Sequence, residues 1–148
     1  MPLKQWADNG WLRAHQTSPQ EIADLLAIVE RDLADAAGDI SPDWQFGIAY
    51  NAALKLCTIL LYVSGYRPEK TLQHFRTLST LPLVLGPART EDADYLETCR
   101  TKRNMAEYEM AGVATPQDAA ELASFARQLR RDVLEWLKKT HPKLLPKG

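Results

Sequence analysis

The sequence has little glycine, little cysteine and no excess of one charge. Glycine accounts for only 7 of the 148 residues, which argues against a glycine-rich all-β protein. The formal net charge is −1, so the overall charge gives no reason to expect a nucleic acid or an anionic membrane as partner. Hydrophobic residues make up 45% of the chain and charged residues 25%, a composition typical of a globular domain with a sizeable core.

Several kinds of chemical site are also missing. Cys57 and Cys99 form no CxxC motif, and we expect two buried thiols in a reducing compartment. The histidines at 15, 74 and 141 have no second metal ligand at helical spacing, so neither a zinc site nor a di-iron bundle is supported. There is no phosphate-binding glycine loop and no nucleophile elbow. We therefore expect no metal and no cofactor.

No segment suggests export or a membrane anchor. Residues 1–9 have no apolar stretch of the kind found in a signal peptide. The longest apolar run, residues 59–63, is far too short to cross a bilayer. We expect a cytoplasmic protein with no membrane contact.

Ser-Pro and Thr-Pro pairs mark the beginnings of long helices. The hydroxyl residue suits the N-cap, and proline suits the first helical position. The pairs are Ser18-Pro19, Ser41-Pro42 and Thr115-Pro116, each followed by an acidic residue in the first turn. Apolar residues at spacings of three and four then predict long helices over residues 19–36, 42–64, 90–112 and 116–140. The second should be central because it is dense in apolar residues and alanine.

The remaining segments predict weaker elements. A shorter helix should begin at Arg67-Pro68, and residues 81–88, interrupted by prolines, should form a loop or short turn. A short helix is expected after Asn9. No alternating strand pattern is present. The sequence therefore predicts an all-α, antiparallel four- to five-helix bundle, one domain over residues 1–148 with its core at about 18–140. Residues expected to be buried include Leu25, Val29, Leu56, Leu60, Leu129 and Val133.

Arg103 is the most informative single residue. It falls in the apolar stripe formed by Leu96, Cys99, Ala106 and Met110. A guanidinium cannot lose its charge, so it needs a partner, a watery cleft or a ligand. Glu107 lies one turn on and suits an ion pair. Two interpretations stay open: a structural Arg–Glu pair at the edge of the core, or an anion-binding cleft.

Polar side chains surround Arg103 on the same predicted helix. Arginine forks onto phosphate, asparagine donates and accepts hydrogen bonds, and tyrosine stacks on a base or donates its hydroxyl. For Tyr108 alone, an aromatic at the edge of the core is the alternative. The candidate nucleotide- or RNA-binding residues are Arg100, Arg103, Asn104, Glu107 and Tyr108.

On these residues the chain resembles the HEPN domains (higher eukaryotes and prokaryotes nucleotide-binding). That family has an arginine, then a polar residue, then a histidine four to six residues after the arginine, late in a helical bundle. Arg103-Asn104 matches the first half. Residues 30–34, 49–53 and 65–67, with His74, resemble earlier parts of such domains. The resemblance covers about residues 18–140 and implies a HEPN-like bundle with a nucleotide- or RNA-binding cleft.

The chain departs from this motif at the histidine. Tyr108 stands at that position, and the next two residues are Glu109 and Met110. Metal-independent RNA cleavage in the family depends on the arginine and the histidine together. A tyrosine hydroxyl titrates near pH 10 and is a poor general base at neutral pH. The resemblance therefore implies weak or no ribonuclease activity.

The family also suggests partners. Such proteins are usually homodimers, and relatives often belong to a toxin–antitoxin or nucleotidyltransferase pair, which makes a nucleotidyltransferase a candidate partner protein. Two alternative functions remain at this point. One is a non-catalytic helical protein–protein interaction module. The other is an active metal-independent endoribonuclease with Arg103 and Tyr108 as the candidate catalytic residues.

Overall fold

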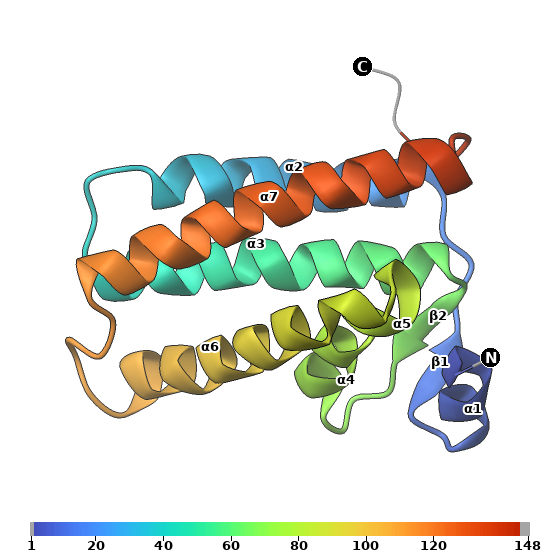
Figure 1. The fold of residues 1–148 in the computed structure, drawn as a ribbon, viewed down its shortest axis with the longest axis horizontal. Helices are drawn as coiled ribbons and strands as arrows, with labels where there is room; N and C mark the ends of the chain where they lie inside the picture. The colour runs from blue at the N-terminus through green and yellow to red at the C-terminus, as the bar shows by residue number, and fades with distance from the viewer. Residues whose placement is uncertain (1, 146–148) are drawn as a thin grey trace.

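A computed structural model describes residues 2–145 of the protein and is predominantly helical (Figure 1). In chain order the elements are α1 (Pro2–Asp8), β1 (Leu12–Ala14), α2 (Pro19–Ala36), α3 (Pro42–Val63), β2 (Tyr66–Pro68), α4 (Gln73–Ser79), α5 (Leu81–Leu85), the 3-10 helix η1 (Pro87–Arg89), α6 (Thr90–Tyr108) and α7 (Pro116–Thr140). The two short strands pair antiparallel, with Arg13 opposite Arg67. The all-α prediction is confirmed, apart from this pair of strands.

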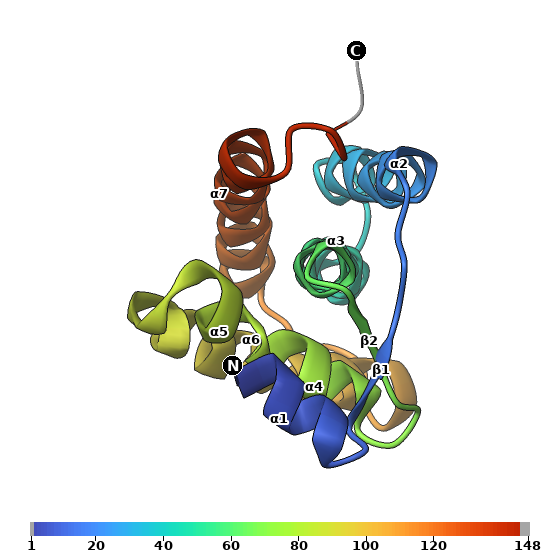
Figure 2. The same cartoon turned by 90° about the vertical axis from the view of Figure 1, so that its right-hand side faces the viewer.

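The helix α3 lies at the centre of the molecule. Figure 2 shows α2, α7 and the α4–α6 layer on different sides of it, and Figure 1 shows successive long helices running in opposite directions. Twelve residues of α3 are buried, including Leu56 and Leu60. By length and composition α3 alone among the described residues would suit a membrane span, but 67% of its apolar window is buried in the protein. The prediction of a central second helix is confirmed.

The predicted helix starts are confirmed by their caps. The hydroxyl of Ser18 accepts a hydrogen bond from the backbone N–H of Glu21 at 3.1 Å. At Thr115 the bonding is reciprocal with Asp118, both at 3.0 Å, which makes a complete capping box. These local bonds explain why α2 and α7 begin at the predicted residues. Thr90 begins α6 as expected, although no side chain caps it.

Three short-range predictions are wrong. Arg67 and Pro68 lie in β2, and α4 begins only at Gln73. Proline disfavours a helical backbone at the residue before it, which explains the extended conformation of Arg67. The N-terminal helix α1 precedes Asn9 rather than following it. Residues 81–88 are mostly helical, because proline is well tolerated in the first turn of a helix.

The core follows the predicted helix faces, with one exception. Five of the six residues expected to be buried are so, and Leu25 is half-buried against the core. Both cysteines are buried, and burial raises the pKa of the Cys57 thiol to about 12. This thiol is therefore a neutral part of the core.

Candidate functional site

The two ends of α6 differ in burial. The buried residues of this helix are Ala93, Leu96 and Cys99, all in its first half. Arg103 and Ala106 are half-buried, and Met110 lies beyond the helix end, 57% exposed. The expected apolar stripe therefore leaves the core after Cys99. The predicted end of this helix near residue 112 is also wrong, because α6 ends at Tyr108.

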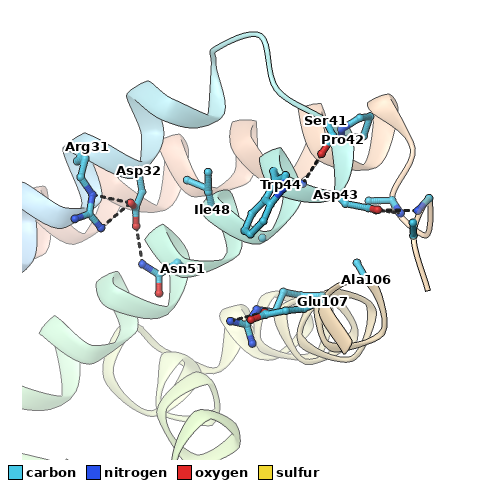
Figure 3. A pocket seen from close by; sticks show the side chains of 15 residues that line it. Arg31, Asp32, Ser41, Pro42, Asp43, Trp44, Ile48, Asn51, Ala106 and Glu107 are labelled. Atoms are coloured by element: carbon cyan, nitrogen blue, oxygen red, sulfur yellow. Dashed lines mark hydrogen bonds and ion pairs between the residues drawn. The ribbon is translucent and has the colours of Figure 1, made fainter. Parts of the chain in front are cut away.

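Two hollows flank the second half of α6. The α3–α6 cleft has a volume of about 770 Å³ and is lined by Arg31, Asp32, residues 41–44, Gly47, Ile48, Asn51, Arg103, Ala106, Glu107, Ala111, Gly112 and Ala114 (Figure 3). The α4–α6 groove has a volume of about 660 Å³ and is lined by His74, Arg100, Thr101, Arg103, Asn104, Met105, Tyr108 and Glu109. Arg103 contributes to both hollows, so it stands between them.

The polar contacts of Arg103 come from its own helix. Its Nη2 lies 2.9 Å from Oε2 of Glu107, and its Nη1 donates to Oδ1 of Asn104 at 3.1 Å. The guanidinium carbon also lies 5.8 Å from the ring centroid of Tyr50. The structural ion pair considered from the sequence is therefore present. Its side chains are 27% and 38% exposed, and a pair of this kind contributes less than about 1 kcal/mol.

Arg100 lies one turn before Arg103 and has a similar arrangement. Its Nε donates to Oε2 of Glu97, three residues earlier, at 2.9 Å. Nearby, the buried hydroxyl of Tyr50 has no hydrogen-bond partner within residues 2–145. Burial raises the pKa of Tyr50, and the two arginines oppose that shift. The phenol is therefore neutral beneath two cations.

A polar network lies on the α2 side of the cleft. The side chain of Asp32 is only 6% exposed and accepts from Nε and Nη2 of Arg31, at 3.1 and 3.0 Å. Its other oxygen accepts from Nδ2 of Asn51 at 2.6 Å. Figure 3 shows the Asn51 amide oxygen turned away from Asp32. The carboxylate thus fixes both neighbours, because each donates to it.

An exposed indole forms one wall of the cleft. Trp44 is 66% exposed, and Figure 3 shows it pointing from α3 toward α6, alongside Ile48. The neighbouring Asp43 accepts from the backbone N–H groups of Gly112 and Ala114, at 2.7 and 3.0 Å. These bonds lower the pKa of Asp43 and hold the α6–α7 loop against the start of α3.

His74 lies in the groove, beside both arginines. Burial first, then the charges of Arg103, Lys55 and Arg100, lower the pKa of His74. The imidazole is therefore neutral at neutral pH. Tyr108, the last residue of α6, is 73% exposed, which is inconsistent with an aromatic at the edge of the core.

The structure divides the predicted site residues between the hollows. Arg100, Arg103, Asn104 and Tyr108 line the groove, whereas Glu107 lines the cleft. Five further residues line the hollows and are not among the predicted site residues: Trp44, Arg31, Asp32, Asn51 and His74. In the sequence, segments 30–34 and 49–53 and His74 carry only the family resemblance, and Trp44 lies in a segment predicted as the central core helix.

Comparison with known proteins gives no match. No family model matches the chain, and neither a curated protein nor a solved structure matches it. The fold and the hollows define a class on their own terms: an α-helical bundle protein with a polar cleft and a groove on either side of one arginine-bearing helix end.

Proposed function

We propose that this protein is a HEPN-like helical bundle that binds a nucleotide or RNA through the second half of α6. The observation that carries the proposal is the position of Arg103. It is a permanent cation between two open hollows, and its polar contacts within residues 2–145 come from its own helix. A phosphate can replace these contacts without breaking a bond between elements.

The groove supplies further groups that suit a phosphate and a base. Arg100 is one turn away from Arg103 and lines the same groove. Guanidinium groups bind phosphate oxygens in a bidentate manner. Tyr108 presents an exposed ring and hydroxyl at the groove's end, where it can stack or donate a hydrogen bond. Asn104 already orients the Arg103 guanidinium.

We expect weak or no RNA cleavage by the isolated protein. The motif histidine is replaced by Tyr108, which is exposed to solvent. A tyrosine hydroxyl is a poor general base at neutral pH. Robust cleavage that Tyr108→Phe abolishes would contradict this and would make Tyr108 catalytic, as in the metal-independent endoribonuclease alternative.

The same proposal includes a cytoplasmic homodimer, with a nucleotidyltransferase as candidate partner protein. A two-fold dimer would bring both Arg103-bearing helix ends toward a shared groove. Glu107 and Tyr108 at the end of α6 are exposed, and these exposed residues support such an arrangement. Sedimentation that gives only monomer at tens of micromolar protein would remove the shared-groove arrangement and leave a monomeric site.

The test of this proposal is the binding of a short single-stranded oligoadenylate, measured by fluorescence anisotropy at low and at raised salt. A phosphate contact makes binding weaken with salt. Arg103→Ala should weaken binding by about 10- to 150-fold, the equivalent of losing a charge-assisted hydrogen bond of about 1.5–3 kcal/mol.

The matched control is Arg131→Ala, an exposed arginine on α7 whose side chain bonds only Gln128 within the described residues. This variant should bind like the wild type. Equal losses in the two variants would indicate a general effect of charge and would remove Arg103 as the phosphate ligand.

The second candidate function is a protein–protein interaction module. It is favoured by one observation: Trp44, Tyr108 and Met110 are large hydrophobic side chains that are 66%, 73% and 57% exposed. Exposed apolar groups of this kind often mark a partner surface. This function gains support if no nucleic acid binds at low salt.

A further inference from the structure

We infer that the α3–α6 cleft is a nucleobase subsite, in which a base stacks on Trp44 above the open surface at Gly47 while its phosphate meets Arg103. The inference rests on the proposed function and deepens it. It adds a second hollow, with its own residues, to the α4–α6 groove, which holds four of the five site residues predicted from the sequence.

Trp44 is unusually exposed for an indole. An indole that is 66% exposed leaves most of its apolar surface in water, which is unfavourable unless something covers it. It points toward α6 across a cleft of about 770 Å³, whose other side is lined by Ala106 and Glu107 (Figure 3). Space therefore remains beside the ring for a flat ligand. Stacking on an aromatic side chain is how single-stranded nucleic acids are commonly held.

A glycine stands at position 47, inside α3. Glycine in a helix interior is less favourable than alanine, so its presence needs a reason. Packing does not provide one: a Cβ at Gly47 would meet Cγ of Arg103 at 3.9 Å, an ordinary contact, as its nearest neighbour. The backbone does not provide one either, since Gly47 is not among the positive-φ glycines. The effect of this glycine is to leave the cleft surface open between Trp44 and Arg103.

The groups around that surface match the parts of a nucleotide. Nucleotides combine a flat apolar ring, polar ring edges and an anion. The cleft offers Trp44 and Ile48 for the ring, the Asn51 amide for an edge, and the guanidinium of Arg103 for the anion. Its volume of about 770 Å³ lies within the range of roughly 300–1,000 Å³ usual for small-molecule sites.

The Asp32 network prepares the polar end of the subsite. Because Nδ2 of Asn51 donates to Asp32 at 2.6 Å, the orientation of the amide is fixed and its oxygen is turned away from the carboxylate (Figure 3). An amide oxygen held in this way can accept from an exocyclic amino group of a base. Arg31 anchors the carboxylate from the other side.

The test compares two ligands that differ only in their bases. One is the single-stranded oligoadenylate, and the other is an abasic ribose-phosphate oligomer of equal length. Wild-type protein should prefer the oligoadenylate. Trp44→Ala should weaken oligoadenylate binding by about 5- to 150-fold, as expected for one lost stacking contact, with abasic binding unchanged. Trp44→Phe, which keeps a ring, should retain most of the affinity.

A second variant fills the space in which the base would lie and leaves Trp44 in place. Gly47→Leu places a side chain on the open surface and should reduce oligoadenylate binding without reducing abasic binding to the same degree. Position 47 accepts a Cβ, and thermal melting in parallel establishes that the leucine variant is folded before its binding is compared. Adenosine monophosphate, measured alongside, distinguishes the source of the base: tighter binding than that of the oligomer indicates a free nucleotide, and weaker binding indicates RNA.

The outcomes separate the inference from the function on which it rests. Binding of both oligomers with no effect of Trp44→Ala or Gly47→Leu would overturn the base subsite and leave the Arg103 phosphate site standing. Binding of neither oligomer at low salt would overturn both. A Trp44→Ala loss that is equal for the two oligomers would also overturn the base subsite, because a stacking contact requires a base.

Discussion

The two halves of α6 have similar sequence patterns but different roles in the structure. The first half places Ala93, Leu96 and Cys99 in the core. The second half continues the same helical period but has no buried residue, and its side chains line the cleft and the groove. One helix is therefore divided between stabilising the bundle and presenting charged and aromatic groups.

The difference comes from what surrounds each half. The helix contacts α3, α4 and α5, and its second half is tied to the rest of the protein through polar links. Lys102 bonds Asp118 at 3.1 Å, and Asp43 holds the loop that follows α6. A solvent-accessible ion pair such as Lys102–Asp118 positions a helix end while adding little stability. Substitutions in the two halves should therefore differ in how far they lower the free energy of unfolding.

The largest effect is expected in the first half. Leu96 is fully buried, so Leu96→Ala should lower the free energy of unfolding by about 2–5 kcal/mol through lost burial and a cavity. In the second half, Met105 is half-buried, so Met105→Ala should lower the free energy of unfolding by less than about 1 kcal/mol. Denaturant unfolding of both variants measures this contrast. Similar losses would mean that the second half belongs to the core.

The next effect concerns the loop after α6 and depends on pH. Two backbone N–H groups lower the pKa of Asp43 below its usual value, so the folded protein favours the ionised carboxylate. The resulting stabilisation is present above the ordinary pKa and is lost as pH falls through the lower, folded-state pKa, that is below about pH 4. Asp43→Asn should lower the free energy of unfolding at neutral pH. In acid, the difference in free energy of unfolding between this variant and the wild type should become smaller. A difference in free energy of unfolding that does not depend on pH would contradict this role.

A smaller effect of opposite sign is expected at the cleft surface. Gly47→Ala should raise the free energy of unfolding by about 0.5–1 kcal/mol, because alanine is the better helix former and its Cβ fits. The same substitution should weaken oligoadenylate binding. A variant that is more stable and binds equally well would show that the open surface at Gly47 serves no ligand.

The smallest effect is a pKa change at His74. Burial is the first cause of its lowered pKa, followed by Arg103 and then Lys55 and Arg100. Removing one cation with Arg103→Gln should therefore raise the His74 pKa part of the way toward its usual value, as NMR titration of the imidazole would measure. Lys138→Gln, distant in the chain on α7, should leave it unchanged. No shift with Arg103→Gln would place the guanidinium farther from the groove.

Local chemistry explains what the sequence alone could predict. The caps at Ser18 and Thr115 are interactions within four residues, so they are readable from the sequence, and α2 and α7 match. The segment around Arg67 is extended for a local reason, the following proline, but its pairing with the distant strand β1 is not visible in the sequence. Periodicity likewise predicted which face Arg103 occupies but not where the neighbouring helices cease to cover that face.

The candidate site shows the same limit. The residues of α6 could be proposed together because they are neighbours on one helix. Trp44 and Asn51 reach the site from another helix, and their exposure and hydrogen bonds depend on how α2, α3 and α6 meet. An apolar residue in a helix dense with buried residues gives no sign that it faces a cleft.

The central claim is that Arg103 serves a ligand rather than the stability of the bundle, and one thermal-shift measurement tests it. Wild-type and Arg103→Ala proteins are melted with and without the oligoadenylate. The account predicts nearly equal melting temperatures without ligand, and a rise on adding the oligomer for the wild type alone, because a ligand that binds only the folded state stabilises it. A melting temperature already lowered by several degrees in Arg103→Ala, with no rise for either protein on adding the oligomer, would contradict the claim and favour a structural Arg103–Glu107 pair.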